Sequence, residues 1–600
     1  MARREENNCK YMCDFETVNN PNDCRVWAWA ATIIGRNFDT EVGVNIDSFM
    51  KWLFSKNSPT IYFHNAKFDT DFILNWLFQN GYEWNNLKAP KRSGTFTTLI
   101  ADNGTFYALK IFPKNSKTYI TIYDSYKLIA LPVAKIPKAF GLKAAKTTID
   151  YDLYRAPGQE LTLLEEIYVV LDCMIVAKAL HIMFSKELYK MTAASNAMTY
   201  YIDLIGGKQF DRWFPSDPES DPIIRNAYYG GAVMVNPLFQ GKIVSPLRIY
   251  DVNSHFPAQL RYQLMPYGVP KKFTGKYPEN RIYPLYVQTI TFSCRLKEGH
   301  LPVIPSSKGF IKQSNEWLIS TEEEVKIGNE ITKVDVQQTY TLTNIDLEML
   351  FEHYDVFDET YQGGYMFKAQ RGMFDKYIDY WMGEKERAVL EKNKGYKYIC
   401  KLFLNSFYGK FGTNPLKGQK EPYYQDGKVC YRDLDKKLER PIYVAVAAFT
   451  TAYARQITLG VANKFIDRFV YCDTDSIHLI GNEVPEGMDI DPARLGAWDN
   501  EYNAECGIYL HAKCYCDKNP FNPETGKPLK DDNGNIIELV IKCAGMTEAQ
   551  KATIKNINDF KVGLELDGKL VPERVSGGTI LKNTTFKIKE KVKKRKVSYV

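Results

Sequence analysis

The stretch from Phe469 to Ile480 restricts the fold of this chain more than any other part of its sequence. It places Asp473-Thr474-Asp475 between two short runs of β-branched and aromatic residues, and Gly481 follows. Two such runs around a turn-forming sequence predict a β-hairpin. If the two carboxylates share one strand face, they converge on one point, where they repel each other unless a cation such as Mg²⁺ or Mn²⁺ lies between them. Because an isolated Asp-x-Asp is more often an acidic surface turn, the rest of the chain has to decide between the two interpretations.

The composition is that of a large globular protein with one unusual feature, its aromatic content. A length of 600 residues predicts several domains, and a hydrophobic fraction of 45% is enough for full cores. The 40 Tyr favour a protein that stacks unpaired bases, although ordinary cores also use aromatic residues. The net charge of +7 is modest. A basic run near the C-terminus either contacts phosphates or is a solvated end; it consists of Lys587, Lys589, Lys591, Lys593, Lys594, Arg595 and Lys596.

The cysteines and histidines argue against a structural zinc site. The 12 Cys are scattered, no Cys-x-x-Cys pair occurs, and only 7 His are present. We expect no signal peptide and no apolar run long enough to cross a bilayer. A reducing, soluble compartment is the simplest interpretation of these features.

Four acidic residues in the first third of the chain form a second candidate site. Asp14 and Glu16 lie two residues apart on a strand-like run, so both point to the same side of it. Asp69 follows another strand-like run, and Asp172 lies one helical turn after Tyr168. Each acid alone would be a surface residue or a helix cap, and Asp69 occupies a position typical of an N-cap. Together they supply the carboxylates that a two-metal phosphodiester hydrolase requires.

These acids lie in motifs that resemble those of a known family. Three patterns resemble the motifs of a DEDDy-type 3′–5′ proofreading exonuclease: Asp14-x-Glu16, Asn65-x-x-Phe68-Asp69 and Tyr168-x-x-x-Asp172. The resemblance implies that the four acids bind two metal ions, that Tyr168 orients the attacking water, and that Asn65 and Phe68 contact the substrate strand.

A domain boundary is predicted after this region, where Pro and Asp are frequent between 215 and 222. Tyr228-Tyr229-Gly230-Gly231 follows. Adjacent glycines allow a close backbone approach, although a lone Gly-Gly is usually only a turn. The segment resembles the Tyr-x-Gly-Gly motif that joins exonuclease and polymerase modules, which implies that Tyr228, Gly230 and Gly231 help to pass the primer end between them.

Asp251 ends a strand-like run and would be a third carboxylate beside Asp473 and Asp475. A helix should begin near Ser254, and its backbone N–H groups could receive a triphosphate. The segment resembles the polymerase pattern Asp-x-x-Ser-Leu-Tyr-Pro, from which it departs at His255 and Phe256. The resemblance implies that Asp251, Val252 and Asp475 bind metal ions with the assistance of Asp473, and that Phe256 lies under the incoming sugar.

Lys401, Asn405 and Tyr408 fall on one face of a predicted helix. An amphipathic helix with a snorkelling lysine would give the same pattern. Lys401-x-x-x-Asn405-Ser406-x-Tyr408-Gly409 nevertheless resembles the family B motif of the fingers helix, which implies contacts to the triphosphate and the base. The resemblance adds two further substrate contacts: Lys385, a second candidate phosphate ligand, and Lys513-x-Tyr515, which resembles the motif that holds the primer terminus.

Taken together, the chain resembles the protein-primed family B DNA polymerases of small tailed bacteriophages. The implied fold is a multidomain α/β and α+β protein, with an RNase H-like exonuclease domain followed by a right-hand polymerase with two insertions. The implied domains are an exonuclease at 1–190, a first part of the palm at 191–262, an insertion resembling terminal-protein region one at 263–372, fingers at 373–412, an insertion resembling terminal-protein region two at 413–442, a second part of the palm at 443–547, and a thumb with a basic tail at 548–600.

The resemblance also implies partners and a place of action. The partners would be DNA template and primer, dNTPs, a terminal protein that primes synthesis, and two Mg²⁺ ions in each active site, with Mn²⁺ as the alternative. The protein would be a monomer without a membrane, in the cytoplasm of the infected bacterial host. Two alternatives remain open: a conventionally primed family B polymerase whose insertions serve processivity, and an inactive nucleic-acid-binding relic, which the full set of seven carboxylates disfavours.

Overall fold

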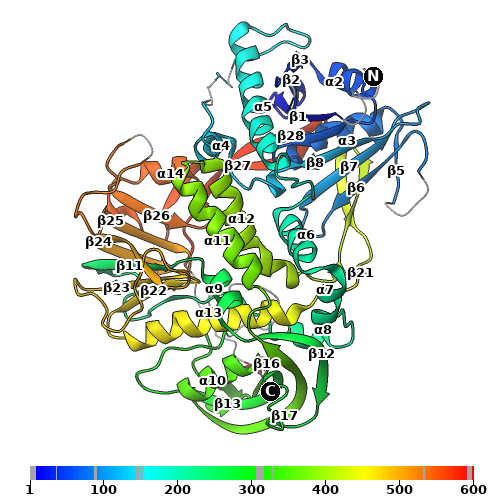
Figure 1. The fold of residues 1–600 in the computed structure, drawn as a ribbon. Helices are drawn as coiled ribbons and strands as arrows, with labels where there is room; N and C mark the ends of the chain where they lie inside the picture. Colours follow the sequence, from blue (N-terminus) through cyan, green and yellow to red (C-terminus); the bar gives the residue numbers. More distant parts are fainter. Residues whose placement is uncertain are drawn as a thin grey trace.

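The computed structural model describes residues 9–35, 37–86, 91–143, 149–150, 153–305, 317–327, 330–531, 534–590 and 598–599. Figure 1 shows a sheet of N-terminal strands at one end of the molecule and a smaller sheet from the middle of the chain at the other end. A second large sheet and a group of long helices lie between them. Of the predicted basic tail, Lys587 and Lys589 lie within the described part and Lys591 to Lys596 lie outside it.

The N-terminal sheet has eight strands. β1 is antiparallel to β2 but parallel to β4, and β4 is parallel to β8. The order across the sheet is β3 (Thr40–Gly43), β2 (Val26–Ile33), β1 (Lys10–Thr17), β4 (Thr60–Phe63), β8 (Ile120–Asp124), β7 (Phe106–Phe112), β6 (Thr95–Ile100) and β5 (Glu83–Trp84). The helices of this region are α2 (Ile46–Ser55), α3 (Lys67–Gln79), α4 (Ile136–Phe140) and α5 (Leu163–Phe184).

Helix α5 confirms the predicted helix that carries Tyr168 and Asp172. It begins with a capping box in which the Thr162 side chain accepts from the Glu165 N–H and the Glu165 side chain accepts from the Thr162 N–H. The expectation that no apolar run could cross a bilayer is wrong, because α5 is long and apolar enough to do so. However, 61% of its most apolar window is buried, and it packs on β1 and β2 as a core helix does.

The second large sheet contains the predicted hairpin, which is confirmed as the antiparallel pair β22–β23. Strand β11 lies between β23 and β24, which places Asp251 next to the hairpin turn. The order is β26 (Leu539–Cys543), β25 (Cys514–Phe521), β24 (Trp498–His511), β11 (Leu247–Val252), β23 (Ser476–Ile480), β22 (Phe469–Asp473) and β9 (Val233–Val235), and β10 (Ile243–Val244) pairs with β24.

Helices between the two sheets form one aromatic-rich core. α12 packs on α11, α6 and α13, and α13 packs on α9. Tyr201, Phe374 and Phe407 contact one another there, with ring centroids 4.9–5.8 Å apart. The helices are α6 (Ala193–Ile205), α7 (Gly207–Trp213), α8 (Asp221–Arg225), α9 (His255–Tyr262), α11 (Asp375–Leu390), α12 (Lys394–Phe411) and α13 (Val444–Lys464). The helix predicted near Ser254 is thus confirmed as α9.

The predicted insertion at 263–372 contains a sheet of its own. Its order is β12 (Met265–Phe273), β17 (Tyr354–Gln370), β13 (Leu285–Leu296) and β16 (Gln338–Thr343), and α10 (Asn344–His353) packs on it. A further small sheet joins β14 (Glu322–Ile327) to β15 (Glu330–Asp335) and, in parallel, to the C-terminal strand β29 (Ser598–Tyr599). The end of the chain therefore returns to this insertion.

Two hairpins from distant parts of the chain complete the fold. The hairpin predicted within 413–442 is confirmed as β19 (Lys420–Gln425) and β20 (Lys428–Asp433), flanked by the pair β18 (Leu416–Lys417) and β21 (Lys437–Leu438). The C-terminal region has α14 (Glu548–Thr553) and the hairpin β27 (Glu565–Val575) and β28 (Gly578–Lys587). Both hairpins reach the N-terminal domain, because Val429, Val575 and Ile580 belong to the apolar cluster of that domain.

Candidate active sites

The first site lies where α5 crosses the N-terminal sheet. Because successive strand residues alternate between faces, β1 points Asp14 and Glu16 to the same side, and α5 packs against that strand. Ligand oxygens of Asp14, Glu16 and Asp172 lie within 4.8 Å of one another. Glu16 and Asp172 are buried and Asp14 is half-buried. Three carboxylates this close favour a hard divalent cation between them.

Asp69 is the fourth carboxylate of this site. The N-cap of α3 is Ala66, so the interpretation of Asp69 as a helix cap is wrong; it lies in the first turn and is only 4% exposed. Burial raises the pKa of the Asp69 carboxyl well above its usual range, and the charges of Asp14 and Glu16 raise it further. Asp69 is therefore electrostatically part of the same cluster, which a bound cation would stabilise.

The other residues predicted for the first site surround this cluster. Tyr168 is buried on α5, one turn before Asp172. Asn65 is exposed, and its backbone N–H donates to Asp124 at 3.0 Å. Phe68 is half-buried and contacts Phe72, with ring centroids 5.6 Å apart. Asn65 and Phe68 line a cavity beside the first turn of α3.

The second site lies at the end of β11. Asp251 is the second-last residue of this strand and pairs with Ser476, which directly follows the β22–β23 turn; the Val252 N–H donates to the Asp475 carbonyl at 2.7 Å. Burial, followed by the charges of Asp475 and Glu501, raises the pKa of Asp251 to about 8. Burial and the charge of Asp473 raise the pKa of Asp475 to about 6. Both carboxylates resist ionisation mainly because they are buried, and neighbouring acids add to the effect, so a bound cation would favour their ionised forms.

Asp473 lies in a different environment from Asp475. It ends β22, whereas Asp475 lies in the turn, so the two residues do not share one strand face. The Lys513 amino group donates to both Asp473 oxygens, at 2.8 and 2.9 Å. The Tyr471 hydroxyl also donates to Asp473, at 3.3 Å. Lys513 thus balances the charge of Asp473, whereas the carboxylates of Asp251 and Asp475 resist ionisation.

The structure adds Glu501 on β24, which the sequence analysis missed. It lines a cavity of about 650 Å³ together with Asp251, Asp473 and Asp475. Its charge raises the pKa of both Asp251 and Asp475. The predicted primer-terminus residues Lys513 and Tyr515 line the same cavity, as do Lys542 and Lys551, which the sequence analysis also missed.

The residues predicted to bind the incoming nucleotide lie on α9, α11 and α12. The ring centroids of Phe256 and Tyr408 lie 4.2 Å apart. The residue predicted to contact the sugar therefore packs on the residue predicted to contact the base. Lys401 is exposed and lowers the pKa of Asp251, which places its positive charge close to the carboxylates. Burial, followed by the charge of Lys401, lowers the pKa of Lys385, so these two lysines form one positively charged region. Asn405 is exposed on α12 between Lys401 and Tyr408.

The Tyr-x-Gly-Gly segment runs directly beside the hairpin turn. A Cβ added at Gly231 would lie 2.6 Å from side-chain atoms of Thr474, whereas Gly230 has open space around it. The Tyr228 ring lies against Gly412 at the end of α12. The segment therefore contacts both the β22–β23 turn and the end of α12.

Two buried residues that the sequence analysis missed hold the segment in place. Arg455 on α13 donates to the Tyr229 and Gly230 carbonyls, at 3.0 and 2.8 Å. Its guanidinium also donates to Asp346 on α10 at 2.7 Å, and both side chains are about 2% exposed. The 263–372 region is therefore connected to the Tyr-x-Gly-Gly segment through the buried Arg455–Asp346 ion pair.

Comparisons with known proteins agree with this arrangement. A family profile described as "DNA polymerase type B, organellar and viral" matches residues 51–164 and 155–491. The DNA polymerase of Bacillus phage M2 is 38% identical over 96% of this chain and 99% of its own, and that of Bacillus phage phi29 is 37% identical over the same shares. The solved phi29 DNA polymerase in complex with primer-template DNA matches with a TM-score of 0.87, at 36% identity, over 97% of this chain and all of the phage chain.

The structural match confirms the predicted fold class, in which an exonuclease-type domain precedes a polymerase. The sequence matches run almost from end to end, so the assignment rests on the whole chain rather than on single motifs. The chain belongs to the phi29-type phage DNA polymerases of the type B family, and it is a DNA-directed DNA polymerase.

Proposed function

We propose that this polymerase extends DNA at the Asp251–Asp475 site. It would remove nucleotides from 3′ ends at the cluster of Asp14, Glu16, Asp69 and Asp172, called the Asp14 cluster below. The observation that carries the proposal is the presence of two carboxylate sites in separate sheets, each with its own set of acids. The substrates would be primer-template DNA and dNTPs, with which the phi29 enzyme has been solved.

At the polymerisation site the residues bind and orient the substrates. Lys401 and Lys385 would bind the triphosphate, and the paired rings of Phe256 and Tyr408 would hold the sugar and base of the incoming nucleotide. Lys513 and Tyr515 would hold the primer terminus beside Asp473. The all-oxygen ligand set fits Mg²⁺, with Mn²⁺ as the alternative; a bound pair would activate the primer hydroxyl and stabilise the leaving pyrophosphate.

At the Asp14 cluster, metal ions held by carboxylates would support hydrolysis of the last phosphodiester bond of the strand. Asp14, Glu16, Asp69 and Asp172 supply only carboxylate oxygens, which again fits Mg²⁺. Tyr168 would orient the attacking water, and Asn65 and Phe68 would hold the 3′ end. Such an activity, next to a polymerase in one chain, would be proofreading.

Protein priming and strand displacement are the finer parts of the proposal. The region 263–372 would dock a terminal protein, and the hairpin β19–β20 would enclose the template. Incubation with dNTPs and a candidate terminal protein, without an oligonucleotide, tests this. Covalent addition of a nucleotide to that protein supports it, and extension of oligonucleotides alone would favour the conventionally primed alternative.

The place of action follows from the family. Phage relatives indicate a protein that works in the infected cell, and we propose the bacterial cytoplasm as its compartment.

A further inference from the structure

A single buried carboxylate joins three segments that are far apart in the sequence. Asp71 on α3 is 3% exposed. It accepts from the Tyr431 hydroxyl at 2.6 Å, from Thr579 Oγ1 at 2.7 Å and from Arg574 Nε at 3.1 Å. Tyr431 belongs to the β19–β20 hairpin, and Arg574 and Thr579 belong to the β27–β28 hairpin. Asp71 thus fixes both hairpins on the domain that carries the Asp14 cluster.

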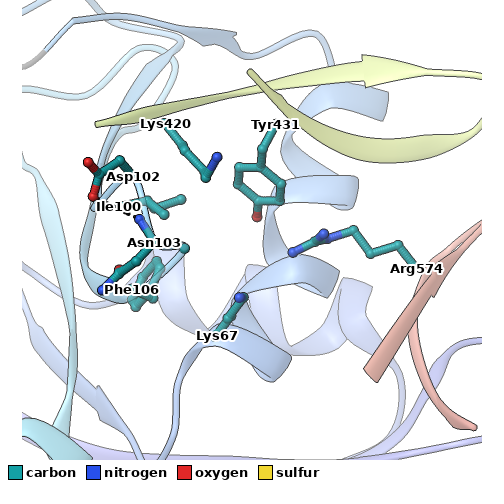
Figure 2. Close-up of a pocket in the computed structure, with 9 residues that line it drawn as sticks. Lys67, Ile100, Asp102, Asn103, Phe106, Lys420, Tyr431 and Arg574 are labelled. Carbon is teal, nitrogen blue, oxygen red and sulfur yellow. Dashed lines mark hydrogen bonds between the residues drawn. The ribbon is translucent and has the colours of Figure 1, made fainter. Parts of the chain in front are cut away.

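A pocket of about 370 Å³ lies beside this junction, between the three segments. Figure 2 shows the nitrogen ends of Lys67, Lys420 and Arg574 pointing into the same space, whereas the Asp102 carboxylate points away from it. The Tyr431 ring lies against Arg574, whose guanidinium is 4.4 Å from the ring centroid. The pocket therefore presents three cationic groups and an aromatic surface to one small volume.

The positive charge of this pocket is only partly balanced by the protein. Arg574 is paired with Asp71, and Lys420 with Asp433 at 2.7 Å. Within the described part of the chain, Lys67 has no carboxylate partner at ion-pair distance. Burial, followed by the charge of Arg574, lowers the pKa of Lys67, and Lys420 contributes to the same effect. An anion placed among the three groups would relieve this repulsion.

The pocket continues toward the first carboxylate site. Lys67 and Arg574 also line a second cavity of about 240 Å³, which Asn65 and Phe68 line as well. Phe68 directly precedes Asp69 of the carboxylate cluster. A strand whose 3′ end lies at that cluster would therefore pass Phe68 and reach the cationic pocket further along its backbone.

We propose that the pocket of Lys67, Lys420 and Arg574 binds a backbone phosphate of the single DNA strand whose 3′ end occupies the Asp14 cluster. The pocket lies at the small end of the range of ligand sites, so it suits about one nucleotide unit and not a duplex. Basic groups beside aromatic rings are the usual combination for single strands. The proposal rests on the proposed exonuclease function, and it assigns to both hairpins a direct contact with the strand that is degraded.

The test compares the degradation of a single strand of about 12 nucleotides with that of a dinucleotide, which is too short to reach the pocket. In the full-length enzyme with Mg²⁺, Lys420→Gln and Lys67→Gln should each raise KM for the long strand roughly tenfold, the factor expected for one charged hydrogen bond. For Lys420→Gln, which lies outside the cavity of Asn65 and Phe68, the kcat for that strand and the rate on the dinucleotide should stay at the wild-type value. Lys420→Arg should restore the wild-type KM, because it keeps the charge.

A matched control comes from α2 of the same domain. Lys51 is exposed and does not line the pocket, so Lys51→Gln removes one charge without affecting the site. Equal KM values for wild type, Lys51→Gln and both pocket variants would overturn the proposal. A parallel fall in the dinucleotide rate of Lys420→Gln would also overturn it, because the substitution would then act through the fold or the metal site. Competition by inorganic phosphate at constant ionic strength, seen in wild type and lost in the variants, would assign the pocket to free phosphate instead.

A binding measurement separates the pocket from the proposed exonuclease. In EDTA, fluorescence anisotropy with the long strand needs no catalysis, and each lost phosphate contact should lower the slope of log Kd against log salt by about 0.7. If the enzyme does not degrade DNA but the salt slope changes in the variants, the phosphate pocket is supported and the exonuclease function is refuted. If the enzyme degrades DNA but the variants have the same salt slope as the wild type, the exonuclease function is supported and the phosphate pocket is refuted.

Discussion

Asp251 and Asp475 are held together at the expense of stability. Their pKa values of about 8 and about 6 lie above the value near 4 of an unfolded aspartate. Their contribution to stability is therefore fully present below pH ~4 and is lost as the pH rises through about 6 and then about 8. Without metal, we expect Asp251→Asn to melt about 2 °C above wild type at pH 8 and close to wild type at pH 4.

Thermal unfolding in EDTA at both pH values measures this effect, and Asp203→Asn, an exposed acid on α6, serves as control. Mg²⁺ at pH 8 should stabilise the wild type more than Asp251→Asn, because bound cations require ionised ligands. A variant that melts below wild type at pH 8 would mean that Asp251 is not under repulsion.

Phe256 should exclude ribonucleotides by shape. Its ring packs on Tyr408 at 4.2 Å, so a flat surface lies where the sugar of the incoming nucleotide is expected. Phe256→Val should increase the use of ribonucleotides relative to deoxyribonucleotides, by roughly tenfold or more. The measurement is the ratio of kcat/KM for dNTP and rNTP. If both efficiencies fall by the same factor, Phe256 is a core residue and not a steric gate.

Residue types and spacings predicted which carboxylates belong to the site, but not that Asp473 and Asp475 have different partners. Asp473 and Asp475 look equivalent in the sequence, and only the fold brings Lys513 to Asp473, because the two residues are 40 positions apart. Glu501 lies on an ordinary strand without a motif, so its place beside Asp251 depends on the pairing of β24 with β11.

The Tyr-x-Gly-Gly segment should control the balance between synthesis and degradation. Gly231 allows the chain to pass Thr474, and a Cβ there would approach the Thr474 side chain to 2.6 Å. Gly231→Ala should displace the β22–β23 turn and raise, several-fold, the dNTP concentration at which extension replaces degradation, while single strands are degraded at the wild-type rate. Gly230→Ala is the matched control, since no atom lies within 4 Å of its added Cβ. Equal switching concentrations for the two variants would leave Gly231 as a simple turn residue.

The hairpin β19–β20 should support processive synthesis. Deleting 415–440 removes Tyr431 and its hydrogen bond to Asp71. The contact that joins this hairpin to the N-terminal domain and the β27–β28 hairpin is then lost. Products on a long primed circle should become several-fold shorter at limiting enzyme, while the addition of one nucleotide stays normal. Asp71→Asn, which keeps the shape and removes the charge, should give an intermediate product length. Full-length products from the deletion variant would refute the role in processivity.

The elements themselves were well predicted because their signals are local. The hairpin at 469–480, the helix after Ser254 and the hairpin within 413–442 follow from alternation, periodicity and turn residues. The docking of the two hairpins was not predicted. Asp71 is separated from Tyr431 by 360 positions and from Arg574 by 503, and in a helical pattern it looks like a surface acid.

At the scale of the whole molecule, the order of the motifs predicted the family, and the fold shows how one chain holds two sites. The Asp14 cluster belongs to the N-terminal sheet, and the Asp251–Asp475 pair belongs to the second sheet. Arg455 connects the Tyr228–Gly231 segment to α10, and Asp71 connects α3 to the β19–β20 and β27–β28 hairpins; neither residue is part of a carboxylate cluster. Chemistry at one site should therefore be separable from chemistry at the other.

The most direct test of this separation measures both activities in two variants. Asp475→Ala should abolish primer extension and leave the degradation of single strands at the wild-type rate. Asp14→Ala combined with Glu16→Ala should abolish degradation and leave extension intact, because the two sites share no ligand. Loss of both activities in either variant, with a circular dichroism spectrum like that of the wild type, would contradict two independent carboxylate sites.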